Sequence, residues 1–214
     1  LKNTSSLLNV NQPTLGAKGT IRINGTPMSA TQSVTRAGTK YIRQQDDNMR
    51  SHLTLYEAMH FAAALKLPHL TAMERHRKII DILIDLNICE SQRTLIGKLS
   101  GGEKRRLAVS LELLSDPALM FIDEPTTGLD SCAATSLLGV LCKLAKGGRT
   151  IVATIQQPSA MLLEKFDSIY CLANGKTLYD GPRINLIPAF NYADLCCPSY
   201  YNPADFCKKF SCNY

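Results

Sequence analysis

Residues 99 to 131 read LSGGEKRRLAVSLELLSDPALMFIDEPTTGLDS, and this stretch decides the fold class. The pattern predicts a helix over 103–114 and then an almost wholly apolar strand over 118–122, the composition of a strand covered on both faces. Ser131 is expected to cap a further helix that runs to about Ala145, where Gly147-Gly148 supplies the C-terminal stop. Helix, strand and helix joined by short connections indicate crossover units on a parallel sheet, and therefore an α/β fold.

The flanking segments extend this pattern in both directions. Residues 150–155 are expected to form a second buried strand, followed by a hairpin that turns at Asn174-Gly175. Before the quoted stretch we expect a short strand over 19–23 and two helices over about 55–67 and 72–86. Both helices begin with a capping box, a threonine followed three residues later by a glutamate: Thr54 with Glu57, and Thr71 with Glu74.

The composition argues against several classes of protein. With 45% apolar and 20% charged residues the chain should fold, so intrinsic disorder is not expected. No apolar run approaches the ~18 residues that a membrane-spanning helix needs. The eight cysteines lack zinc-site spacing and no apolar signal region opens the sequence, so we expect reduced thiols. The net charge of +6 is spread along the chain and names no partner by itself.

Two adjacent carboxylates, Asp123 and Glu124, follow the apolar strand. In open α/β sheets, ligands bind beyond the carboxyl ends of the strands. The first carboxylate could hold Mg²⁺ through water while the second acts as a base on the reacting atom, as nucleotide hydrolysis requires. Taken alone, the pair could equally be a helix cap or a solvated turn.

The segment Leu99 to Glu103 opens a helix with two glycines. Glycines leave backbone N–H groups and the positive end of the helix dipole accessible, which makes an anion-binding site. A flexible loop with an ordinary cap is the alternative. The segment 99–103 and the carboxylate pair occur together at this spacing, so we do not expect both patterns to have arisen by chance.

At these residues the chain resembles the nucleotide-binding domain of ATP-binding cassette (ABC) transporters. The segment 99–103 resembles the signature motif, 119–123 the Walker B strand, and 128–130 the D-loop. The resemblance implies that Glu124 is the catalytic base, that Asp123 contacts Mg²⁺, and that nucleotide is bound by Ser100, Gly101, Gly102 and Asp130.

Three further motifs resemble the G subfamily, the half-transporters of the eye-pigment and sterol-exporter type. They lie at 103–108, 154–159 and 202–206. In that family Gln45 would be the Q-loop glutamine, a Mg²⁺ contact and the link to the membrane domain. Gln44 remains open for this role, because the segment that follows is one residue longer than usual.

The fold implied is a RecA-like P-loop NTPase core, of the ABC ATPase type, with an inserted α-helical subdomain. We expect a single incomplete nucleotide-binding domain over residues 1–214. It would comprise a residual P-loop and β-subdomain over 1–45, a helical subdomain over 46–116, a Walker B and switch core over 117–182, and a C-terminal connection over 183–214.

The N-terminal residues depart from the P-loop pattern G-x-x-x-x-G-K-[ST]. Only the tail of that motif is present: Ser5 and Ser6 fit, Thr4 stands where the lysine belongs, and Lys2 lies two places early. The resemblance gives Lys2, Ser5 and Ser6 nucleotide-binding roles, with Ser5 also on Mg²⁺. Because the chain starts at Leu1 without a methionine, we expect its start to be an incomplete end.

Gln156 occupies the position of the family's switch histidine, which contacts the γ-phosphate. Glutamine can donate a hydrogen bond but cannot carry the charge of an imidazolium, so as a catalytic residue it predicts slower hydrolysis. A merely polar strand end is the alternative reading of this residue.

Three functions follow from these observations. The first is the ATP-hydrolysing motor of a half-transporter that exports a lipid, sterol or other small amphipathic substrate. The second is a catalytically impaired cassette that lends its signature motif to a partner's ATP site. The third is a soluble ABC ATPase acting on nucleic acid or ribosomes through Lys104-Arg105-Arg106, although three basic residues on a helix are usually a solvated face.

The resemblance also implies cofactors, partners and location. The cofactors would be ATP and Mg²⁺. The partners would be a second nucleotide-binding domain, in a homo- or heterodimer, and the transmembrane domain of a half-transporter, with no nucleic acid. The domain itself would lie on the cytoplasmic side of a membrane.

Overall fold

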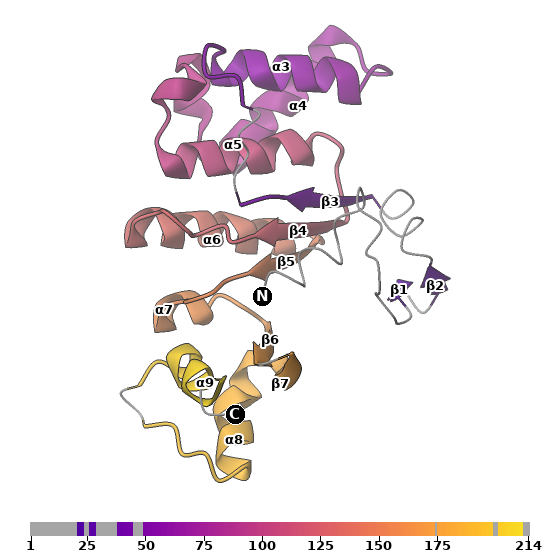
Figure 1. The fold of residues 1–214 in the computed structure, drawn as a ribbon. Helices are drawn as coiled ribbons and strands as arrows, with labels where there is room; N and C mark the ends of the chain where they lie inside the picture. Colours follow the sequence, from indigo (N-terminus) through magenta and orange to yellow (C-terminus); the bar gives the residue numbers. More distant parts are fainter. Residues whose placement is uncertain are drawn as a thin grey trace. The chain divides into compact units, whose positions relative to one another are not determined.

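The computed structural model describes residues 21–23, 26–28, 38–44, 49–173, 175–198 and 201–211 (Figure 1). The chain separates into two compact units, one over Lys2–Thr154 and the other over Ile155–Tyr214. The predicted four-part division of the chain stays a prediction.

The first unit contains a parallel sheet of three strands in the order β3-β4-β5. These strands are β3 (Thr39–Ile42), β4 (Leu119–Asp123) and β5 (Thr150–Thr154). The register places Tyr41 beside Phe121 and Asp123 beside Thr154. The predicted parallel α/β sheet is confirmed, and all three strands end at the same edge, where a ligand would bind.

The two faces of the central strand differ. Met120 and Ile122 are fully buried, whereas Leu119, Phe121 and Asp123 are only half-buried. The expectation that the strand over 150–155 is buried was wrong, because Val152 of β5 is 43% exposed. An apolar run does not report which face is covered, since apolar side chains also occur on surfaces.

Three helices make up the region between β3 and β4: α3 (Leu55–Lys66), α4 (Ala72–Asp85) and α5 (Gly101–Leu113). Two 3₁₀ turns, η1 (Cys89–Arg93) and η2 (Ile96–Lys98), lead into α5. Both predicted capping boxes are present, which explains why α3 and α4 begin where the sequence indicated. Helix α5 contacts α3, α4 and β3, so it joins the helical region to the sheet.

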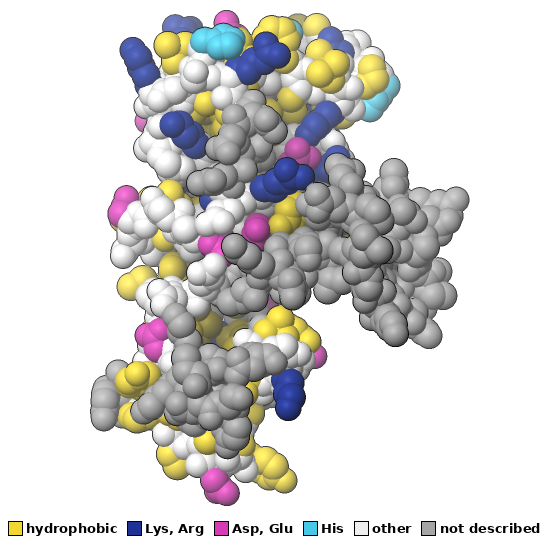
Figure 2. Space-filling view, viewed as in Figure 1, with side chains coloured by type: hydrophobic (Ala, Val, Ile, Leu, Met, Phe, Trp, Pro, Cys, Tyr) yellow, Lys and Arg dark blue, Asp and Glu magenta, His cyan; other side chains and the backbone are white. Residues whose placement is uncertain are grey.

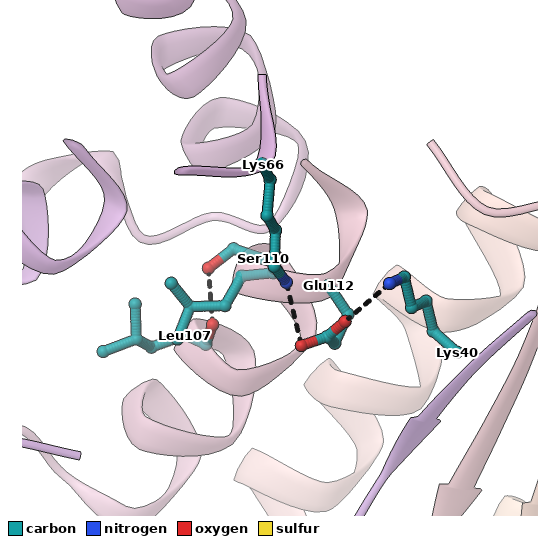
Figure 3. A network of polar contacts seen from close by, with 6 residues as sticks. Lys40, Lys66, Leu107, Ser110 and Glu112 are labelled. Atoms are coloured by element: carbon teal, nitrogen blue, oxygen red, sulfur yellow. Dashed lines mark hydrogen bonds and ion pairs between the residues drawn. The ribbon is translucent and has the colours of Figure 1, made fainter. Parts of the chain in front are cut away.

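One carboxylate on α5 ties the helix to two other elements (Figure 3). Glu112 Oε1 lies 3.0 Å from Lys66 Nζ on α3, and Oε2 lies 3.8 Å from Lys40 Nζ on β3. The same Lys66 ammonium donates to the carbonyl oxygen of Leu111 at 2.8 Å. These contacts hold α5 to α3 and to the sheet.

Helix α6 (Ser131–Lys146) follows β4 and packs against α5 and β5. Its apolar side, which includes Leu137, Leu138 and Leu141, is buried. Gly147 ends the helix and Gly148 follows with a φ of 97°, a conformation that glycine adopts readily. The predicted glycine stop is confirmed.

The remaining elements of the first unit lie near the N-terminus. Strands β1 (Ile21–Ile23) and β2 (Thr26–Met28) form an antiparallel pair. This confirms the part of the predicted 19–23 strand that the structure describes; Gly19 and Thr20 lie outside the described residues.

The second unit is built on a hairpin of β6 (Ser168–Ala173) and β7 (Lys176–Pro182), as predicted. Around it lie α7 (Ala160–Leu163), η3 (Arg183–Asn185), α8 (Leu186–Tyr192) and α9 (Pro203–Ser211). A small core joins α8 and α9: Leu186, Phe190, Phe206 and Cys207. None of the described helices is long and apolar enough to cross a bilayer.

Candidate functional site

Asp123 ends β4, and hydroxyl groups from both neighbouring strands hold its carboxylate. The Tyr41 hydroxyl on β3 donates to Oδ2 at 3.2 Å, and the Thr154 hydroxyl on β5 donates to Oδ1 at 2.6 Å. Parallel register explains the convergence, because Tyr41, Asp123 and Thr154 project from the same face of the sheet. Both carboxylate oxygens are therefore oriented by the fold.

Glu124 follows with a φ of 44°, in the left-handed region that a non-glycine residue occupies at a cost of about 1–3 kcal/mol. Its backbone N–H donates to the carbonyl oxygen and the hydroxyl of Thr154, at 3.1 Å each. The chain thus turns sharply after β4 and is held in that turn by β5. Strained backbone of this kind is concentrated at functional sites.

The side chain of Glu124 is anchored through one oxygen. Oε2 accepts from Gln44 Nε2 at 2.8 Å and from Thr127 Oγ1 at 3.0 Å. Gln44, one of the two candidate glutamines, thus contacts the Glu124 carboxylate. Gln45 lies outside the described residues, so its predicted Mg²⁺ contact stays a prediction.

Arg105 on α5 links this turn to the segment after β3. Its guanidinium donates to the carbonyl oxygen of Arg43 at 2.8 Å and to that of Glu124 at 3.4 Å. Sequence reasoning missed Arg105, Tyr41, Thr127 and Thr154 as parts of the site. The adjacent ends of parallel strands were a signal for Tyr41 and Thr154, whereas nothing in the sequence pointed to the contacts of Arg105.

The N-terminus of α5 begins at Gly101, two residues before the predicted start, and Ser100 is its N-cap. The Glu103 carboxylate accepts from the Ser100 N–H at 2.9 Å and from the Ser100 hydroxyl at 2.7 Å. A hydrogen bond from the Ser91 hydroxyl, followed by those from Ser100, lowers the pKa of Glu103. The N–H groups of Gly101 and Gly102 come next in the helix, where an anion would bind.

The loop that follows Glu124 packs onto this helix start. A Cβ built on Gly101 would lie 3.3 Å from Cδ2 of Leu129, so the glycine allows the close approach of the two segments. Gly128 has a φ of 78°, which suits the tight turn before Leu129.

Asp130 is the N-cap of α6, because its Oδ1 accepts from the Ala133 N–H at 2.8 Å. The prediction that Ser131 caps this helix was wrong by one residue. Aspartate and serine are comparably good N-caps, so two adjacent candidates could not be told apart by type. The predicted nucleotide contact of Asp130 stays a prediction.

A hollow of about 350 Å³ lies where these segments meet. Its lining includes Gln44 after β3, Gly101, Lys104 and Arg105 of α5, and Thr127 and Leu129 of the loop after β4. The two basic side chains favour an anionic ligand or surface at this position.

Comparisons with known proteins agree with this arrangement. A family model described as "ABC transporter" matches residues 4–127, more than half of the chain. The chain belongs to the ABC transporter family.

Several curated ABC proteins are similar over most of the chain. "Protein white" of Drosophila melanogaster is 40% identical over 191 residues, which cover 86% of this chain and 27% of that protein. "Broad substrate specificity ATP-binding cassette transporter ABCG2" of Rattus norvegicus is 37% identical over 211 residues, 94% of this chain and 32% of that protein. "ABC transporter G family member 11" of Arabidopsis thaliana is 36% identical over 193 residues, which cover 87% of this chain and 27% of that protein. The predicted resemblance to the G subfamily is confirmed.

The chain spans about a third or less of the length of these relatives. Among solved structures, cbiO1 of Clostridium perfringens, part of the ABC transporter complex cbiONQ, superposes with a TM-score of 0.71 at 20% identity. The match covers 89% of this chain and 78% of that chain. It confirms the predicted ABC ATPase fold. ATP hydrolysis is the activity of this family.

The structure therefore brings part of the predicted ABC site together. Asp123 and Glu124 lie beside Gln44, and the signature glycines lie beside the D-loop. Lys2, Ser5 and Ser6 lie outside the described residues. Gln156 is exposed and belongs to the second unit, whereas the carboxylates belong to the first.

Asp123 and Gln44 can supply oxygen ligands of the kind that a magnesium ion prefers. Mg²⁺ is bound by one or two carboxylates together with substrate phosphates, rather than by an all-protein cage. Asp123 supplies an oriented carboxylate, and Gln44 donates its nitrogen to Glu124, which leaves its amide oxygen for a cation. No cluster of three metal-binding side chains occurs in the described part of the chain, and this mode of binding does not require one.

Proposed function

We propose that this chain binds and hydrolyses ATP as the motor domain of a G-type ABC half-transporter. The orientation of Glu124 carries the proposal, because a strained turn and two side chains direct its carboxylate at the end of the sheet. A carboxylate at this edge can accept a proton from the water that attacks a phosphate.

Each described residue has a role in this proposal. Glu124 acts as the base, and Gln44 and Thr127 orient it. Asp123 would hold Mg²⁺, and Tyr41 and Thr154 fix the direction of its carboxylate. When bound, Mg²⁺ offsets the negative charge of the phosphates during transfer. Four further residues are proposed to contact ATP: Lys2, Ser5, Ser6 and Gln156. None of them belongs to the site described above.

The signature segment needs a second domain. Ser100 and Gly101 are exposed at the start of α5, where their backbone can face a phosphate. We infer that Ser100, Gly101, Gly102 and Asp130 complete the ATP site of a second nucleotide-binding domain in a head-to-tail dimer. The membrane partner would be a transmembrane domain, with this domain on its cytoplasmic side, and the cargo a lipid, sterol or other small amphipathic molecule.

The test is the substitution Glu124→Gln in the 214-residue chain. Fluorescent-nucleotide titration should give an ATP affinity within about twofold of wild type, while phosphate release falls by two to three orders of magnitude, since general-base catalysis contributes about 10²–10⁴-fold. Glu90→Gln, an exposed glutamate on η1, is the matched control and should retain full activity. Unchanged turnover in Glu124→Gln would overturn the assignment.

A second candidate is an impaired cassette that only completes a partner's ATP site. The exposed signature segment and the glutamine at position 156 favour it. In a mixed dimer with a fully active domain, Gly101→Val would then reduce the partner's turnover, while Glu124→Gln would leave the total rate unchanged. If Glu124→Gln lowers the rate, the chain is itself a motor.

The nucleic-acid function receives no support from the proposed basic patch. Arg105 donates to carbonyl oxygens of its own chain, and Arg106 Nη2 donates to Ser136 Oγ at 2.8 Å. Figure 2 shows Lys and Arg side chains dispersed over the face in view. These arginines stabilise the fold of the first unit.

A further inference from the structure

Two cysteines of the second unit lie side by side. Sγ of Cys171, on β6, is 3.7 Å from Sγ of Cys207, on α9. Helix α9 packs against β6, and Cys207 is one of the four residues that form the core of this unit (Figure 1). The two thiols are 36 positions apart in sequence, so the fold brings them together.

The pair differs in reactivity and access. Cys171 is half-buried and Cys207 is buried at 8% exposure, so oxidants reach Cys171 first. Hydrogen bonding from the Cys207 thiol lowers the pKa of Cys171, and the same contact, followed by burial, raises the pKa of Cys207. The thiolate is the reactive form of cysteine, so Cys171 is the nucleophile and Cys207 the resolving thiol.

We propose that Cys171 and Cys207 are a reversible dithiol–disulfide site that covalently clamps α9 to the β6–β7 hairpin when the oxidant is a peroxide. The inference is independent of the proposed ATPase function, because it rests on the geometry of the second unit alone. Disulfides in reducing compartments are characteristically transient and regulatory.

The chemistry balances with hydrogen peroxide. The Cys171 thiolate attacks one peroxide oxygen, the O–O bond breaks, and hydroxide leaves, which gives a sulfenic acid. The Cys207 sulfur then attacks the Cys171 sulfur, the S–O bond breaks, and water leaves with the Cys207 proton. Two thiols lose two electrons in total, and one peroxide becomes two molecules of water.

The clamp would act close to the loop that carries Gln156. Asn202 precedes α9 and donates from Nδ2 to the carbonyl oxygen of Pro158 at 2.8 Å, and its Oδ1 accepts from the Ala204 N–H at 3.1 Å. A disulfide that fixes α9 would therefore also restrain Asn202, and through its hydrogen bond to Pro158 the loop that carries Gln156.

Peptide mapping of the full chain tests the proposal. After treatment with hydrogen peroxide and alkylation, digestion with trypsin and Asp-N places Cys171 in the fragment 167–176 and Cys207 in the fragment 205–208, each as the single cysteine. We expect these fragments linked, with two of the eight thiols lost and both recovered by dithiothreitol. The melting temperature should rise by several degrees on oxidation, because the crosslink closes a long loop.

Two variants make the result specific. Cys196→Ser, an exposed cysteine in the same unit, should retain the linkage and the thermal shift. Cys171→Ser should lose both, and its melting temperature in dithiothreitol shows that it is folded. Linkage of Cys207 to Cys197 or Cys212, oxidation without a linked peptide, or a linked peptide without a thermal shift would overturn the proposal.

Discussion

The Tyr41 hydroxyl lies 3.2 Å from Oδ2 of Asp123, although the two residues are 82 positions apart in sequence. Thr154 contacts the other carboxylate oxygen from the opposite side. The carboxylate is thus held between two strands, and its orientation depends on both.

Tyr41→Phe removes one of these two hydroxyl groups and should cost about 1 kcal/mol of unfolding free energy, the typical net value of a hydrogen bond. The Mg²⁺ concentration needed for half-maximal ATP binding should also rise, because Asp123 is less well oriented. Urea denaturation and Mg²⁺ titration measure the two effects. Tyr192→Phe, on α8 at a position that is 94% exposed, is the control and should change neither; equal effects in both variants would contradict the role of Tyr41.

Asp130→Ala should destabilise the chain by about 1 kcal/mol, because the N-cap of α6 loses its acceptor for the Ala133 N–H. Ser131→Ala should change the unfolding free energy by less than about 0.5 kcal/mol, as expected for an exposed side chain that does not cap the helix. Denaturant midpoints of the two variants decide between the adjacent candidates. A larger loss in Ser131→Ala would show that serine is the cap.

Glu112→Gln leaves Lys40 and Lys66 without their shared carboxylate. These side chains are about one third exposed or less, so we expect a loss of about 1 kcal/mol, near the upper end for surface ion pairs. Asp85→Asn removes the more exposed pair with Lys143 and should have an effect close to zero. The two denaturation curves give the comparison, and equal losses would mean that the Glu112 pairs are as weak as an exposed one.

Stability should decrease in acid through the capping-box glutamates. Backbone and side-chain hydrogen bonds from Thr54 and Thr71 lower the pKa values of Glu57 and Glu74, and Ser91 and Ser100 lower that of Glu103. A carboxylate whose pKa is lower in the folded state stabilises the fold above its unfolded pKa. This contribution is lost as the pH falls through the folded value.

The measurement is the melting temperature of wild type and Glu103→Gln between about pH 3 and pH 7. Glutamine cannot titrate, so the variant should be less stable than wild type at pH 7 and the difference should shrink in acid. A difference that stays constant with pH would show that Glu103 does not contribute through its charge.

Elements with strong local signals could be predicted from the sequence. The helices that follow Thr54 and Thr71, the strands expected over 118–122 and 150–155 and the β6–β7 hairpin all depend on chemistry within a few residues. The prediction that Asp123 and Glu124 follow the end of an apolar strand was correct for the same reason, because the end of a strand is a local feature of the sequence. Strand β3 was not predicted.

What the sequence did not reveal depends on contacts between distant segments. The exposure of Val152 depends on which face of the sheet is covered, and the hydrogen bond from Gln44 to Glu124 joins residues 80 positions apart. Arg105 contacts carbonyl oxygens, which no side-chain pattern encodes. Local periodicity carries no information on such pairings.

The contacts of Asp123 with two neighbouring strands make its orientation depend on the alignment of the sheet. Side chains alternate between faces along a strand, so a slip of one residue in β3 or β5 would carry Tyr41 or Thr154 to the other face. Such a misaligned chain could keep its helices and much of its apolar core and still have a carboxylate that points in no defined direction. The direction of this carboxylate is therefore a property of how three strands are paired, and not only of which residues they carry.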